Sequence, residues 1–148
     1  MVVLCDTRQQ AGKHKNIDDY LDKRGIKRNR QALYVGDYML ANDGSVSVDT
    51  KQDVRELAMD VFQDHDRFVR ECVRARDAGI TLYVLTEEKL PGGRLDRWEP
   101  PQGCRVDPAR LRQALITLTG EYGVQFRFCD GRSTGKKLME LLTTRERW

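Results

Sequence analysis

The chain lacks most of the features that stabilise small secreted proteins or carry a protein into a membrane. It contains only two histidines and four cysteines, the latter at Cys5, Cys72, Cys104 and Cys129. No two cysteines form a Cys-x-x-Cys pair, which argues against a structural zinc site, and their scattering argues against a disulfide framework. No apolar run approaches the roughly 20 residues of a membrane-spanning helix, and no signal-peptide pattern opens the sequence. We therefore expect reduced thiols in a cytoplasmic protein without a membrane partner.

The length of 148 residues suits a single domain, and we expect residues 1–148 to share one core. The net charge of +3 is small, but the charges are unevenly distributed. Residues 8–30 carry eight Lys or Arg against three Asp, and residues 67–76 carry a second basic group. Such a surface suits contact with phosphates, although a solvated face is the alternative for any single arginine.

Hydrophobic periodicity and turn signals predict strands that alternate with helices. The expected order is a strand at 2–5, a helix at 16–24, strands at 33–40 and 45–50, helices between 54 and 79, a strand at 80–85, a helix from Pro108, a strand at 124–129 and a helix at 133–145. The segment at about 90–106 is rich in Pro and Gly and is expected to be a mobile loop. This order predicts a three-layer α/β fold with a central mixed sheet.

Charged residues gather on the hairpin that Asn42-Asp43-Gly44 predicts. If the turn centres there, Asp37 and Asp49 lie nearly opposite one another. Strand alternation then places Asp49 and Lys51 on one face, and Asp6, at the end of the first strand, could join them. Two carboxylates can hold a hard divalent cation, and an ammonium beside them can orient a water. The alternative is a solvated, charged strand edge, because an Asp-x-Lys pattern alone is weak.

Five short motifs follow one another along the chain: Asp6-Thr7-Arg8-Gln9, Val35-Gly36-Asp37-Tyr38, Asp49-Thr50-Lys51, Asp66-Arg67-Phe68 in a predicted helix, and Leu85-Thr86-Glu87 at a predicted strand end. In their order and spacing they resemble the XPF-type structure-specific endonuclease domain, a branch of the PD-(D/E)xK nucleases, in which the first three motifs read Asp-x-Arg-Glu, Val-Gly-Asp-Tyr and Glu-Arg-Lys. Three positions depart from the family pattern. Gln9 replaces a Glu, Asp49 is shorter than the usual Glu, and Arg55 stands where the family has an acid.

The resemblance implies a restriction-endonuclease-like fold and hydrolysis of DNA with Mg²⁺ or Mn²⁺. The metal ligands would be Asp37, Asp49 and the Thr50 carbonyl, with Asp6 binding directly or through water. Lys51 would orient the attacking water. Arg8 would act with these catalytic residues at the scissile phosphate. The expected DNA contacts are Arg8, Arg67, Arg70, Lys13 and Lys15.

By the same resemblance the substrate would be branched or flapped duplex, and the role would lie in DNA repair or recombination. The sequence contains no tandem helix-hairpin-helix domain, so we interpret it as the nuclease module alone. Residues 108–145 are the candidate surface for a homodimer, and a prokaryotic or phage origin is the expectation. The alternative function is a catalytically weak or inactive DNA-binding module that acts with a partner nuclease.

Three further features invite a function that we do not assign to them. Gly131–Lys137 looks like a phosphate-binding loop, but its glycine spacing is one residue short, so no nucleotide cofactor is expected. His14 and His65 have no spacing that joins them to the acids, and exposed polar roles are expected for both. Trp98 could stack on a base, but we expect it to anchor its own loop.

Overall fold

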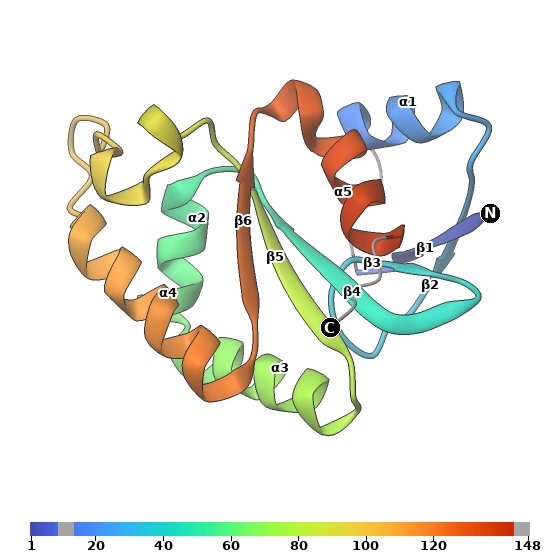
Figure 1. The fold of residues 1–148 in the computed structure, drawn as a ribbon, viewed down its shortest axis with the longest axis horizontal. Helices are drawn as coiled ribbons and strands as arrows, with labels where there is room; N and C mark the ends of the chain where they lie inside the picture. The colour runs from blue at the N-terminus through green and yellow to red at the C-terminus, as the bar shows by residue number, and fades with distance from the viewer. Residues whose placement is uncertain (9–13, 144–148) are drawn as a thin grey trace.

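The computed structural model describes residues 1–8 and 14–143. Its centre is a six-stranded sheet in the order β2-β1-β3-β4-β5-β6 (Figure 1). The strands are β1 (Val2–Asp6), β2 (Lys27–Gln31), β3 (Tyr38–Leu40), β4 (Asp43–Lys51), β5 (Thr81–Glu87) and β6 (Gln125–Cys129). The pairs β1–β2, β4–β5 and β5–β6 are parallel, whereas β3 is antiparallel to both neighbours. The predicted mixed sheet is therefore confirmed.

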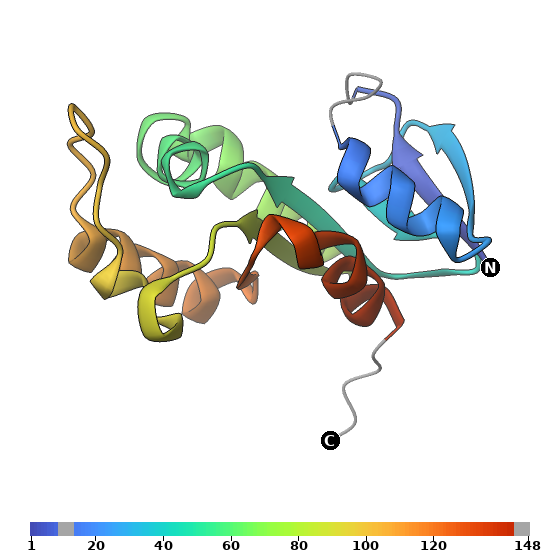
Figure 2. The same ribbon diagram turned by 90° about the horizontal axis from the view of Figure 1, so that it is seen from above.

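Helices cover both faces of this sheet, which confirms the predicted three-layer fold (Figures 1 and 2). One face carries α1 (Lys15–Lys23) and α5 (Thr134–Thr143). The other carries α2 (Val54–Ala58), the π-helical turn η1 (Met59–Gln63), α3 (His65–Asp77) and α4 (Pro108–Tyr122). Short 3-10 turns form η2 (Pro91–Gly93), η3 (Leu95–Arg97) and η4 (Gly131–Ser133). No helix within the described ranges is both long and apolar enough to cross a membrane.

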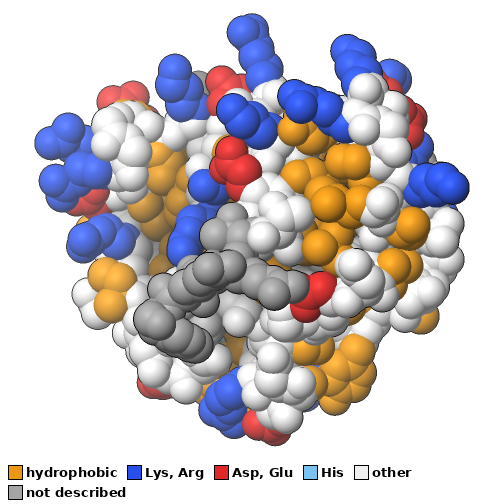
Figure 3. Space-filling model, turned by 45° about the vertical axis from the view of Figure 1, so that its right-hand side comes forward, with side chains coloured by type: hydrophobic (Ala, Val, Ile, Leu, Met, Phe, Trp, Pro, Cys, Tyr) orange, Lys and Arg blue, Asp and Glu red, His pale blue; other side chains and the backbone are white. Residues whose placement is uncertain are grey.

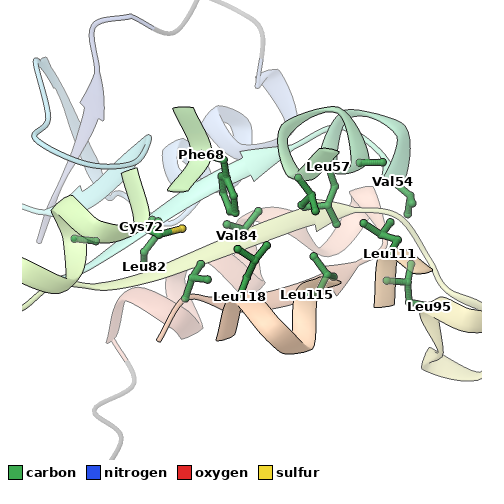
Figure 4. Close-up of a cluster of buried hydrophobic side chains, with 14 of the residues drawn as sticks. Val54, Leu57, Phe68, Cys72, Leu82, Val84, Leu95, Leu111, Leu115 and Leu118 are labelled. Carbon is green, nitrogen blue, oxygen red and sulfur yellow. The ribbon is translucent and has the colours of Figure 1, made fainter. Parts of the chain in front are cut away.

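Each face of the sheet has its own hydrophobic core. Figure 4 shows the cluster beneath α2, α3 and α4, where Val84 of β5 lies between Phe68 and Leu118. The neighbours of Val84 in the strand, Tyr83 and Leu85, belong to the cluster beneath α1 and α5. Because side chains alternate along a strand, β5 contributes to both cores. A fully buried aliphatic side chain contributes about 1.5–3 kcal/mol, so these two clusters hold the helices in place.

The hairpin pairs the residues around Asp37 and Asp49 as the sequence predicts, but its turn lies at Ala41-Asn42 rather than at Asp43-Gly44, because β4 already begins at Asp43. Tyr38 pairs with Val48, and the backbone N–H of Asp37 donates to the Val48 carbonyl at 2.9 Å. A bulge follows between Met39 and Leu40. With this register Asp37, which directly precedes β3, lies beside the last residues of β4, which continues to Lys51.

Three elements differ from the sequence prediction. Strand β2 was not predicted, because every residue of Lys27–Gln31 is exposed and the strand lacks an apolar pattern. The strand expected at 33–40 begins only at Tyr38. The helix from Val54 passes into a π-helical turn at Met59–Gln63, in which Phe62 is exposed.

Two local details complete the fold around the site. Helix α1 begins at Lys15, one residue before the predicted start, and the side-chain amide of Asn16 donates to the Gly131 carbonyl. In the Pro- and Gly-rich segment, Leu90, Leu95 and Trp98 are buried against the core. The prediction that Trp98 anchors its own loop is thus confirmed, while the mobility of residues 90–106 stays a prediction.

Candidate functional site

Strands β1, β3 and β4 together place acids at one end of a concave site. Asp6 is the last residue of β1, and its backbone N–H donates to the carbonyl of Asp37 at 2.8 Å. The site has a volume of about 420 Å³ and is lined by ten charged side chains. These are Asp6, Asp37, Asp49, Asp60 and Glu71, with Arg8, Lys51, Arg67, Arg70 and Arg74. The acids and the lysine that the sequence singled out therefore converge.

The Asp37 carboxylate is fixed by the backbone and the side chain of Thr50. Its Oδ2 accepts from the Thr50 amide at 2.9 Å and from the Thr50 hydroxyl at 3.0 Å. The N–H and C=O of one residue point to the same side of an extended strand. The Thr50 carbonyl therefore faces the strand edge at which the Asp37 carboxylate lies, as the metal-ligand prediction requires.

Lys51 is enclosed between two carboxylates. Its ammonium lies 3.0 Å from Oδ2 of Asp49 and also forms an ion pair with Oδ2 of Asp60. Burial disfavours the charged ammonium, but Asp49 and Asp60 outweigh burial and raise the pKa of Lys51. Lys51 is therefore a fixed, positively charged group at neutral pH.

Burial and nearby carboxylates disfavour negative charge on two of the acids. Burial, and then the neighbouring Asp37, raise the pKa of Asp49 well above its usual value. Burial also raises the pKa of Glu71, against the hydrogen bond that its Oε1 accepts from Gly36 at 3.1 Å. A bound cation would relieve this penalty because it stabilises the ionised carboxylates.

The described residues include no group of three or more His, Cys, Asp or Glu side chains with metal-site spacing. A site here would use Asp37, Asp49 and the Thr50 carbonyl, with water completing the shell. That donor set suits Mg²⁺, which is usually bound by one or two carboxylates and keeps several waters.

Asp6 organises the entrance of the site. One oxygen of this buried carboxylate accepts from the Leu33 amide at 3.0 Å, and the other accepts from Nε of Arg8 at 2.8 Å. Arg8 also donates from Nη2 to the Leu33 carbonyl at 3.0 Å, although its side chain remains 65% exposed. The guanidinium of Arg8 is thus held at the rim, while metal binding by Asp6 stays a prediction.

The predicted DNA-binding residues divide into two groups. Arg67 and Arg70 line the rim of the pocket, where Arg67 lies 3.7 Å from both Asp60 and Asp64. Lys15 does not line the pocket and forms an exposed ion pair with Asp19 on α1. The prediction for Lys13 falls outside the described residues. On the face shown in Figure 3, Asp and Glu lie between several of the Lys and Arg side chains, so the basic side chains do not form an uninterrupted positive surface there.

Sequence reasoning missed Asp60 and Glu71. Two acids flank Arg55, but Asp53 accepts from the Glu56 amide at the start of α2 and Glu56 accepts from the Gln52 amide, and neither lines the pocket. Asp60 reaches Lys51 from the following π-helical turn. For Glu71 a signal existed, because it lies four residues after Arg67 and so on the same helix face.

His14 was also missed, and the prediction of an exposed role for it is wrong. It is only 6% exposed, and its Nε2 lies 3.2 Å from the Thr50 hydroxyl that donates to Asp37. No spacing in the sequence links His14 to these residues. The acid Glu87, by contrast, accepts from Asn16 and does not line the pocket.

Comparison with known proteins agrees with this architecture. The family described as the ERCC4 domain matches residues 5–142. The solved structure of XPF from Aeropyrum pernix matches with a TM-score of 0.70 and 20% identity, covering 96% of this chain and 63% of that one. XPF from Aeropyrum pernix in complex with DNA matches with a TM-score of 0.71 and 20% identity, covering 95% and 62%. The chain thus spans less than two thirds of these structures. Among curated proteins no match is found.

Proposed function

Because the chain belongs to the ERCC4 domain family, we propose that it is a metal-dependent endonuclease that hydrolyses phosphodiester bonds in branched or flapped DNA. The observation that carries this proposal is the meeting of Asp37, Asp49 and Lys51 in one concave site with arginines at its rim. A degenerate DNA-holding module would have no need of a lysine enclosed between buried carboxylates, because such charges are costly to bury.

The proposed cofactor is Mg²⁺ or Mn²⁺, held by Asp37, Asp49 and the Thr50 carbonyl. When bound, such a cation polarises a phosphoryl oxygen and lowers the pKa of a bound water. Thr50 keeps the Asp37 carboxylate in one orientation through two hydrogen bonds. A preformed ligand geometry of this kind reduces the cost of ordering on binding.

Lys51 and Arg8 would contribute positive charge at the reacting phosphate. The two carboxylates that flank Lys51 fix its ammonium and keep it protonated, so it can donate a hydrogen bond to a water or to a phosphate oxygen. The contacts of Arg8 with Asp6 and Leu33 hold its exposed guanidinium nearby. Planar guanidinium groups suit bidentate phosphate recognition.

The rim arginines Arg67, Arg70 and Arg74 would track the DNA backbone. Each neutralised phosphate releases condensed counterions, so binding should weaken as salt increases, by a slope that rises with the number of contacts. XPF from Aeropyrum pernix has been solved in complex with DNA, and we extend DNA binding to this chain as part of the proposal.

We further propose a homodimer that pairs through residues 108–145. Strand β6 is an edge of the sheet, and Ile116 on α4 is 49% exposed beside a groove of about 450 Å³ that is lined by α4, β6 and the segment 90–95. Pairing of this edge with a partner copy would give its unpaired backbone groups hydrogen-bond partners. Analytical ultracentrifugation tests the proposal: a monomeric wild type, or a dimer that survives Ile116→Arg, would refute it.

The decisive experiment measures nicking of labelled plain duplex, flap, splayed arm and four-way junction with Mg²⁺, Mn²⁺ or EDTA. We expect metal-dependent cutting of the branched substrates by the wild type and loss of cutting in Asp49→Asn. Asp96→Asn is the matched control, because Asp96 pairs with Arg94 away from the site. Binding without cutting in either metal would refute the catalytic proposal and leave the DNA-holding alternative.

A further inference from the structure

We infer that Tyr34 forms a subsite that stacks on the base of an unpaired nucleotide beside the acidic pocket. The inference rests on the proposed function and deepens it, because it names the feature of the DNA that the site recognises. Tyr34 lies three residues before Asp37 and lines the same pocket. A base bound there would therefore belong to a nucleotide close to the scissile phosphate.

The aromatic ring of Tyr34 is exposed to solvent and is not part of either hydrophobic core. The residue is 59% exposed, whereas its neighbours Leu33 and Val35 are buried. A singly exposed hydrophobic residue is ordinary in itself. Position distinguishes this one, since the ring stands at the mouth of a pocket whose other exposed side chains are charged.

Three hydrogen bonds fix the backbone at Leu33 and Tyr34. The Leu33 amide donates to Asp6, and the Leu33 carbonyl accepts from Arg8. Arg74 donates from Nη1 to the carbonyl of Tyr34 at 3.0 Å. The backbone at Leu33 and Tyr34 therefore needs little further ordering when a ligand binds, and such preorganisation favours binding.

Arg74 also supports the ring itself. Its guanidinium lies 5.3 Å from the centroid of the Tyr34 ring, within the distance of a cation–π interaction. A base that stacks on the tyrosine would extend this pair, and a cation beside it would attract the adjoining phosphate. Aromatic stacking combined with arginine contacts to the backbone is the usual chemistry of single-strand recognition.

The same geometry selects against fully paired DNA. In a duplex the faces of each base are covered by its neighbours, so a ring at the rim has no face to contact. An unpaired nucleotide at a flap or junction can present its base, and one stacked base typically changes affinity by about 5- to 150-fold. Tyr34 would thus place single-stranded DNA of a branch next to Asp37 and Asp49.

The test compares flapped duplexes that differ only in an abasic residue, placed in turn at each unpaired nucleotide near the branch. Affinity is measured by fluorescence anisotropy in EDTA, so that cutting cannot interfere. We expect the wild type to bind the intact flap about 5- to 150-fold more tightly than the flap with an abasic residue at the contacted position. Tyr34→Ala should abolish this difference, and Tyr34→Phe should retain it.

Phe62→Ala is the matched control. Phe62 is 38% exposed and lies against Arg110 at 5.0 Å, but it does not line this pocket. The inference is overturned if the wild type shows no base dependence at any position, if Tyr34→Ala retains it, or if Phe62→Ala loses it. Base-dependent binding without any metal-dependent cutting would support the subsite and refute the proposed nuclease, so the two failures are distinguishable.

Discussion

Gly36 provides a sharp test of how closely the backbone packs beside the candidate site. Its φ of +76° lies in the left-handed region, where a Cβ costs roughly 1–2 kcal/mol. A Cβ at this position would overlap Oγ of Ser47 and would lie only 3.3 Å from the Val48 carbonyl oxygen. Ser47 cannot move away easily, because it is fully buried and its hydroxyl donates to the Val35 carbonyl at 2.6 Å.

The magnitude for Gly36→Ala follows from these two effects. Backbone strain of about 1–2 kcal/mol adds to an overpacking cost of about 1–3 kcal/mol, so the free energy of unfolding should fall by about 2–5 kcal/mol. This is a large share of the roughly 5–15 kcal/mol of a typical domain. Cutting should fall as well, because Gly36 donates to Glu71 and precedes Asp37.

Urea unfolding gives the measurement, with Gly123→Ala as the matched control. Gly123 has a φ of +77°, but a Cβ there meets nothing within 4 Å. Its substitution should therefore cost only the backbone strain, about 1–2 kcal/mol. An unchanged m-value would show that the denatured states are comparable.

A double-mutant cycle with Ser47→Ala separates the overlap from other effects. The substitution removes the overlapping Oγ, so Gly36→Ala should cost about 1–3 kcal/mol less in the Ser47→Ala background than in the wild type. Equal costs for Gly36→Ala and Gly123→Ala, or a coupling energy near zero, would refute the packing argument.

Three further predictions concern the charges of the site. Asp60→Asn should lower the cutting rate by about 10- to 100-fold, because Lys51 loses one of the carboxylates that fix it; single-turnover assays beside the surface control Asp77→Asn test this. In EDTA, the wild type should become more stable relative to Asp49→Asn as the pH falls from about 8 to about 5. The reason is that the raised pKa of Asp49 makes the folded state bind a proton that the unfolded chain releases. Urea unfolding across this range tests this, and a constant difference between the unfolding free energies of the two proteins would contradict it. Mg²⁺ at about 100 times its Kd should stabilise the wild type by about 2.7 kcal/mol, and the double substitution of Asp37 and Asp49 to Asn should remove the effect; an equal thermal shift in both proteins would argue against these ligands.

The hairpin could be predicted because local signals determine it. Alternation along residues 45–50 sets which residues share a face. The turn lies at Ala41-Asn42 and not at the predicted Asp43-Gly44, but the bulge between Met39 and Leu40 offsets this shift, so Asp37 still approaches Asp49. Helix α4 was equally predictable, since Asp107 caps it and Leu111 faces the core. Each of these signals lies within a few residues of the structure that it specifies.

Strand β2 and the acids on the helical face were not predictable in the same way. Lys27–Gln31 is an edge strand with only exposed residues, so it has no hydrophobic pattern and exists because β1 offers a partner. Asp60 lies on η1 and Glu71 on α3, so both reach the site only after these helical elements pack over the sheet. Their role depends on tertiary contacts, which hydrophobic periodicity does not predict.

The two faces of β4 explain why a buried strand can carry an acid. Val48 belongs to the core beneath α1 and α5, and Thr50 lies on the same face, where its hydroxyl reaches His14. Asp49 points to the opposite face, where Lys51 forms ion pairs with both Asp49 and Asp60. An unpaired carboxylate there would be protonated or strongly destabilising. Lys51 offsets part of the cost of burying the Asp49 carboxylate, and a divalent cation held by Asp37 and Asp49 would offset more of it. Cation affinity should therefore increase with pH for the same reason that Asp49 resists ionisation.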